Sequence, residues 1–163
     1  MGVLHLYFNA ANAEAAFRAN LASPLVAFTT VESKVADPAV VLGHLVALIA
    51  KVPWTAGLIG GTLVSPNPAT KPASAEAYAQ LPEDSPWRTG PWLQEFSIRT
   101  RNILAELDTS RHVELAAQWG RLNEFRHIPD NEKAFLTQLV LDFSDLAKQA
   151  RGADHRIYCW SSL

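Results

Sequence analysis

Residues 155–163 of the chain, HRIYCWSSL, place a tyrosine, a cysteine and a tryptophan side by side directly after a helical pattern. Successive side chains of a β-strand point to opposite faces of its sheet. One face of this predicted strand therefore carries Ile157 and Cys159. The other face carries Tyr158 and Trp160, so the strand predicts an aromatic side and an aliphatic side.

Residues 3–9, VLHLYFN, alternate in the same way and predict a strand near the start of the chain. Its leucines and Phe8 form one side, which we expect to face a layer of helices together with Ile157 and Cys159. The two terminal strands would then be neighbours in one sheet. The opposite side of that sheet would carry five amphipathic side chains: His5, Tyr7, Asn9, Tyr158 and Trp160.

Amphipathic helical patterns dominate the middle of the chain. Asp37 followed by Pro38 marks a helix start, because aspartate caps free amides and proline fits the first helical position. The most regular pattern runs from Asp130 to Arg151, and Gly152 after it suits a left-handed stop. It carries an apolar stripe: Phe135, Leu139, Phe143, Leu146 and Ala150. Together these patterns predict an α+β fold, in which a small mixed β-sheet with adjacent N- and C-terminal strands is packed on one side by amphipathic helices.

Three further stretches have the composition of strands: residues 24–31, 57–65 and 91–96. Between the last two lies a loop excursion, residues 66–91, that holds six of the ten prolines. Long ordered loops in compact domains are usually functional or mobile. Because this loop carries Tyr78 and Trp87, we expect it to fold back on the body and to cover the aromatic face.

Length and composition are those of one globular domain, residues 1–163. Of these residues 48% are hydrophobic and 18% are charged. A chain of this size buries about 70% of its unfolded surface and needs no disulfide or metal to fold. Fourteen basic and sixteen acidic side chains give a formal charge of −2. This balance favours neither nucleic acid nor a membrane surface as a partner.

Three features of the sequence favour a cytoplasmic location. Cys159 is the only cysteine and cannot form an internal disulfide. The first residues lack the basic segment and the apolar run of a signal peptide. The longest apolar stretch, residues 38–52, contains His44 and is shorter than the ~20 residues that span a bilayer.

The sequence contains no pattern that identifies catalytic or metal-binding residues. Cys159 and His155 share a side of the predicted strand, but they lie ~13 Å apart at ~3.3 Å per residue, too far for the ~3 Å hydrogen bond that activates a thiol. The five histidines lack the short sequence spacings of metal sites: His5, His44, His112, His127 and His155. A metal site formed by histidines that are brought together only by the fold stays open. The motifs therefore predict no catalytic residue, metal or cofactor.

Two classes of function are compatible with these observations. The first is a non-enzymatic binding module that recognises a protein partner, as an immunity factor or regulator does, through the aromatic sheet face. The alternative is a small-molecule-binding protein or small enzyme, with a His/Tyr/Trp-lined pocket under residues 66–91 and His5 or His155 as acid–base. The candidate binding residues are His5, Tyr7, Asn9, Tyr78, Trp87, Tyr158 and Trp160. A purely structural interpretation is that the rings form a second small core beneath the loop.

Overall fold

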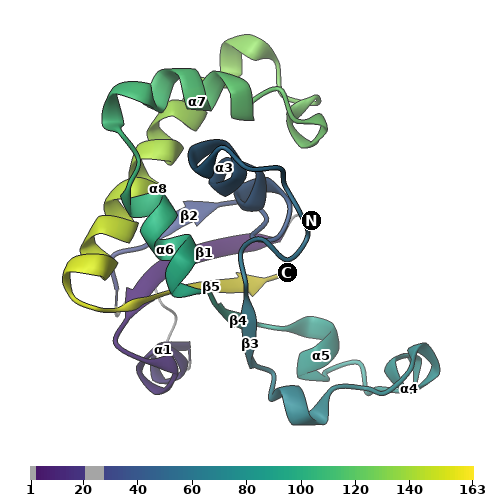
Figure 1. Ribbon diagram of the computed structural model, residues 1–163. Coiled ribbons are helices and arrows are strands. Elements are labelled where there is room, and N and C mark those ends of the chain that lie inside the picture. Colours follow the sequence, from purple (N-terminus) through teal and green to yellow (C-terminus); the bar gives the residue numbers. More distant parts are fainter. Residues whose placement is uncertain (1–2, 21–27) are drawn as a thin grey trace.

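A five-stranded sheet lies at the centre of the molecule (Figure 1). The computed structural model describes residues 3–20 and 28–163, and the strands within them follow the order β2-β1-β5-β4-β3. Their bounds are Leu4–Ala10 for β1, Val31–Ser33 for β2, Thr62–Ser65 for β3, Trp92–Glu95 for β4 and Arg156–Ser162 for β5. The predicted α+β class is confirmed, and β1 lies directly beside β5, so the terminal strands are adjacent as expected.

All strand pairs within the described residues are antiparallel, so the sheet is not mixed. Whether a strand runs parallel or antiparallel to its neighbour depends on the end of the sheet at which the preceding connection finishes. No local pattern in the sequence specifies that end. Of the strand predicted at 24–31, residues 24–27 lie outside the described residues, residues 28–30 are not in a strand, and only Val31 belongs to β2.

The register of β1 and β5 decides which side chains share a face. Leu6 lies opposite Trp160, and Tyr7 lies opposite Cys159. Directly opposite residues point to the same side of a sheet. The expectation that the leucines of β1 share a face with Ile157 and Cys159 is therefore wrong. Both faces of the sheet are covered, and the polar side chains of His5, Tyr7 and Asn9 form hydrogen bonds on the helical side, so their polarity does not mark a solvent-exposed side.

Helices cover the face that carries Tyr7 and Cys159 (Figure 1). They are α3 (Val41–Ala50), α6 (Ile98–Ala105), α7 (His112–Trp119) and α8 (Phe135–Gly152). In the core beneath them, the rings of Tyr7 and Phe143 meet edge to face with centroids 4.9 Å apart. Trp119 is fully buried and donates its indole N–H to the carbonyl of Val41 at 2.7 Å. Burial of side chains of this size stabilises the fold by about 1.5–3 kcal/mol each.

The second face of the sheet is covered by α1 (Ala13–Asn20). Phe8 of β1 stacks on Phe28 with ring centroids 4.8 Å apart, and it packs with Leu93 and Tyr158 in a smaller core. Asn12 starts α1 by accepting the amide of Ala15 at 2.9 Å. A second core therefore exists, but α1 lies over it instead of the proline-rich loop.

The ends of the helices differ from the predicted ones. Asp37 accepts the amide of Val40 at 2.7 Å, one turn ahead of α3. The segment from Asp130 forms a separate 3-10 turn before α8 begins. Asp154 adopts the left-handed conformation after α8, with φ of 53°, so Gly152 is not the stop residue.

Residues 66–91 connect β3 to β4 and are here called the arm. The arm contains a 3-10 turn at Pro68–Thr70 and two short helices, α4 (Ala75–Ala79) and α5 (Pro86–Thr89). Figure 1 shows that it extends away from the sheet and the helical layer. The expectation that the arm folds back over the sheet is therefore wrong.

Candidate functional site

The structure separates the five side chains that the sequence predicted on one aromatic face. His5, Tyr7 and Asn9 lie on the helical side of the sheet, whereas Tyr158 and Trp160 lie on the side covered by α1. Tyr7 and Tyr158 are both fully buried. The combined face therefore does not exist, although each half of it is present.

On the helical side, polar side chains of β1 and β5 form a buried row. His5 Nδ1 lies 2.8 Å from Ser161 Oγ, and Cys159 Sγ lies 3.5 Å from the same oxygen and 4.0 Å from His5 Nδ1. Tyr7 donates its hydroxyl proton to the carbonyl of Ala36. The histidine that approaches the cysteine is thus His5 and not His155. Only the cross-strand register creates this proximity, so strand spacing within β5 could not have revealed it.

This row is not arranged for nucleophilic chemistry. Burial raises the pKa of the Cys159 thiol to about 12, and burial lowers the pKa of the His5 imidazole. At neutral pH the pair is therefore a neutral thiol and a neutral imidazole. A cysteine nucleophile reacts as the thiolate, which burial disfavours here. The row is instead a structural network held by the hydrogen bonds of His5, Tyr7 and Cys159.

The other predicted histidine is also held in a structural network. His155 Nδ1 lies 2.7 Å from Asn9 Oδ1. The guanidinium of Arg101, which is buried, donates to the carbonyl of His155 at 2.8 Å and lies 3.4 Å from Asp154. These contacts attach α6 to the turn between α8 and β5. Neither His5 nor His155 is among the residues that line the cleft and depressions described below.

On the other side of the sheet, the hydroxyl of Tyr158 donates to Glu95 Oε2 at 2.7 Å. Burial and this carboxylate raise the pKa of Tyr158. Arg156 lies 4.0 Å from the second oxygen of Glu95. This group stabilises the pairing of β4 with β5 and faces α1.

Within the described residues, no His, Cys, Asp and Glu side chains gather in a group that could hold a metal ion. In the same residues, no helix combines the length and the apolar character needed to cross a bilayer.

The arm places the remaining two predicted residues, Tyr78 and Trp87, close together. The Tyr78 hydroxyl donates to the carbonyl of Trp87 at 3.1 Å, and the indole N–H of Trp87 donates to Thr70 Oγ1 at 3.1 Å. Arg88 donates to the carbonyl of Ala79 at 3.2 Å. The arm is thus held in shape by its own hydrogen bonds, and Tyr78 remains 43% exposed.

A cleft of about 520 Å³ opens between the base of the arm and α1. We call it the α1–arm cleft. Its apolar walls are Phe17 from α1, Val64 from β3, and Pro66, Pro86 and Trp87 from the arm. Phe17 is 42% exposed. Phe17 is not among the binding residues predicted from the sequence.

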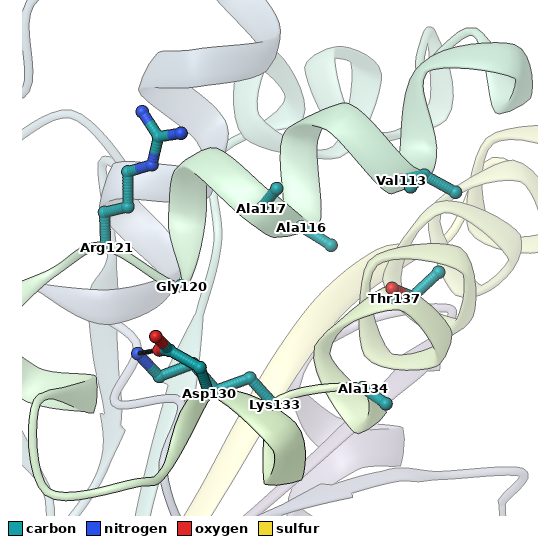
Figure 2. A pocket seen from close by; sticks show the side chains of 9 residues that line it. All are labelled: Val113, Ala116, Ala117, Gly120, Arg121, Asp130, Lys133, Ala134 and Thr137. Atoms are coloured by element: carbon teal, nitrogen blue, oxygen red, sulfur yellow. Dashed lines mark hydrogen bonds and ion pairs between the residues drawn. The ribbon is translucent and has the colours of Figure 1, made fainter.

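A second depression, of about 440 Å³, lies between α7 and α8 (Figure 2). Small residues of the two helices and of their adjoining caps line it: Ala116, Ala117, Gly120, Ala134 and Thr137. Asp130 and Lys133 form an ion pair of 2.8 Å at one end, and Figure 2 shows Arg121 pointing away from that pair. These small side chains select no particular occupant, and we assign the depression no function.

Comparison with known proteins finds no matching family model, no similar curated protein and no similar solved structure. Function must therefore be inferred from the side chains and their geometry.

Proposed function

We propose that this protein is a non-enzymatic binding module that recognises a protein partner through the arm and the α1–arm cleft. The observation that carries the proposal is the position of Trp87. This half-buried indole lies on an arm that projects from the body and forms one wall of an apolar cleft. Tryptophan beside a desolvated pocket is the residue type that most often dominates binding energy at protein interfaces.

The internal hydrogen bonds of the arm support a recognition role. Ordering a long loop on binding costs conformational entropy, and a loop that is already ordered avoids most of that cost. Here Thr70, Tyr78 and Arg88 hold the arm in one shape through contacts within the arm itself. The arm therefore presents Trp87 and the exposed Tyr78 ring in a fixed arrangement.

The polar groups of the cleft favour a protein segment over a small polar ligand. Small-molecule sites combine apolar walls with a few convergent polar groups. In this cleft Asn67 accepts the amide of Ala69, and Thr70 accepts the indole N–H of Trp87. Both side chains are thus engaged in shaping the arm. Apolar side chains of a partner fit such a cleft best.

We place this recognition in the cytoplasm. Cys159 is buried and unpaired in the described part of the chain, which suits a reducing compartment.

A selection from a random linear peptide library, displayed on phage, tests the proposal. Peptides are enriched on the full chain and then counter-selected on the Trp87→Ala variant. We expect enriched peptides rich in apolar residues, whose affinity falls by about 30-fold or more in Trp87→Ala, the loss typical of a hot-spot residue.

Two further variants separate a binding defect from a distorted arm. Phe17→Ala alters the opposite wall of the cleft and leaves the hydrogen bonds of the arm intact, and it should weaken the same peptides. Val113→Ala, which shortens a side chain that is 59% exposed on α7, is the control and should leave binding unchanged. If no enriched peptide distinguishes the wild type from Trp87→Ala and Phe17→Ala, the proposal is wrong.

A further inference from the structure

The two edge strands of the sheet, β2 and β3, differ in how readily another strand could pair with them. At one edge, β3 has an irregular register between Leu63 and Ser65 and runs directly into Pro66. Irregular pairing and proline are the usual devices that prevent another strand from adding to an edge. At the other edge, β2 pairs with β1 in continuous register from Val31 to Ser33. The β2 edge carries no further strand among the described residues.

A groove runs along the β2 edge, between β2 and the flank of α8. It consists of two contiguous depressions of about 340 and 330 Å³, which share Glu32 and Asp142 as lining residues. Leu139 and Leu146 of α8 form its apolar floor. A strand added beside β2 would therefore lie over a helix and would not project into solvent.

The register of β2 shows what each side of an added strand would meet. Val31 and Ser33 pair with Tyr7 and His5 and so share the helical side of the sheet, whereas Glu32 points to the other side. Alternate side chains of an added strand would accordingly face α8 on one side and the neighbourhood of Glu32 on the other.

The charges along the groove are mostly negative. Glu32, Asp142 and Asp145 line it, against the single cation Lys34. Gln138 donates to Asp142 at 2.8 Å, but none of the three carboxylates forms an ion pair with another described residue. An occupant with lysine or arginine side chains would complement these carboxylates on both sides of the strand.

We propose that the groove between β2 and α8 accepts an extended segment of a partner protein that combines basic and apolar residues, and that this segment adds to the sheet as a strand beside β2. Backbone hydrogen bonds to the β2 edge supply affinity in this mode of recognition, and alternate side chains supply specificity. Apolar side chains of the segment contact Leu139 and Leu146, and its cations meet Asp142, Asp145 and Glu32. This surface is independent of the α1–arm cleft.

The probes are short synthetic peptides with alternating lysine and valine, titrated into the isotope-labelled full chain. Binding is followed by amide chemical shifts and by hydrogen exchange. We expect the lysine–valine peptide to protect amides of residues 30–34. The same peptide with N-methylated backbone amides should not bind, because it cannot pair with a strand edge. A glutamate–valine peptide of equal length should bind more weakly than the lysine–valine peptide.

Charge reversal tests the electrostatic part. The Asp142→Lys/Asp145→Lys double variant should bind the lysine–valine peptide about tenfold more weakly and gain affinity for the glutamate–valine peptide. The matched control is Glu106→Lys/Glu124→Lys, which makes the same change in net charge at exposed positions outside the groove. Trp87→Ala should leave this titration unchanged, so failure here is distinguishable from failure of the arm proposal.

Several results would overturn the inference. They are protection of no β2 amide by the lysine–valine peptide, equally tight binding of its N-methylated form, and equal weakening of binding in the control variant and the groove variant. Protection of the same amides in the free chain, through self-association at higher concentration, would identify a second copy as the occupant and would equally overturn it.

Discussion

Cys159 shows how burial changes the chemistry of a single residue. Its thiol is 1% exposed and lies among Tyr7, His5 and Ser161. Removal from water disfavours the thiolate, so the folded chain keeps the proton on sulfur to a pH at which an exposed thiol has lost it. The proximity of a histidine does not reverse this effect, because burial also keeps that imidazole neutral.

Replacing Cys159 with alanine should reduce the loss of stability at alkaline pH. An unfolded thiol titrates near pH 9.0, whereas the folded one titrates at about 12. Between these values the unfolded chain releases a proton that the folded chain retains, so the free energy of unfolding falls as the pH rises. Below pH 9.0 the contribution of this group is fully present.

The measurement is urea unfolding of the wild type and Cys159→Ala on both sides of pH 9.0. Burial also raises the pKa values of Tyr7 and Tyr158, which are present in both proteins, so a smaller residual slope remains in Cys159→Ala. Identical pH dependence in the two proteins would contradict the assignment to Cys159.

Trp119 joins two helices of the layer above the sheet. It ends α7, is fully buried, and bonds to the carbonyl of Val41 at the start of α3. The Trp119→Phe variant removes that indole donor and leaves unfilled volume in the core. We expect it to lose about 2 kcal/mol of unfolding free energy, because the loss of a buried hydrogen bond, about 1 kcal/mol, adds to the cost of the cavity.

The same helix supplies a matched control. Val113 lies on the outer side of α7 and is 59% exposed, so Val113→Ala should change stability by about 0.5 kcal/mol or less. Urea denaturation of both variants provides the comparison. Equal effects at the two positions would show that Trp119 does not connect α7 to α3.

At the scale of the whole molecule, the arm and β5 contribute unequally to the fold. The arm forms its hydrogen bonds internally and extends from the body, whereas β5 pairs with both β1 and β4. Replacing residues 67–89 with a short glycine–serine linker should therefore change the free energy of unfolding by about 1 kcal/mol or less, since shortening a loop alters its closure entropy only slightly.

The arm-deleted chain should keep the near-ultraviolet circular dichroism and the cooperative unfolding of a folded protein. It should no longer bind the peptides whose affinity depends on Trp87. The contrasting deletion, of residues 156–163, removes the strand between β1 and β4 and should abolish cooperative unfolding. If the arm deletion abolishes cooperative unfolding, or if the β5 deletion leaves it intact, the arm and β5 do not contribute to stability as stated here.

Local patterns in the sequence were sufficient to identify the two terminal strands and the apolar stripe of α8. The alternation in residues 3–9 and 155–162 identifies β1 and β5, because a strand repeats every two residues whatever its surroundings. Ser97 accepts the amide of Thr100 at the start of α6, and the apolar stripe of α8 follows the period of a helix. These signals act over a few residues, and the sequence contains them in full.

Which sides of those elements meet was decided only by the tertiary structure. Tyr7 and Tyr158 are equally apolar, and nothing within either strand indicates that the first faces α8 and the second faces α1. The pairing register sets that choice, and it joins residues about 150 positions apart, beyond the reach of any local pattern. For the same reason the approach of His5 to Cys159, the outward course of the arm and the groove beside β2 follow from long-range packing.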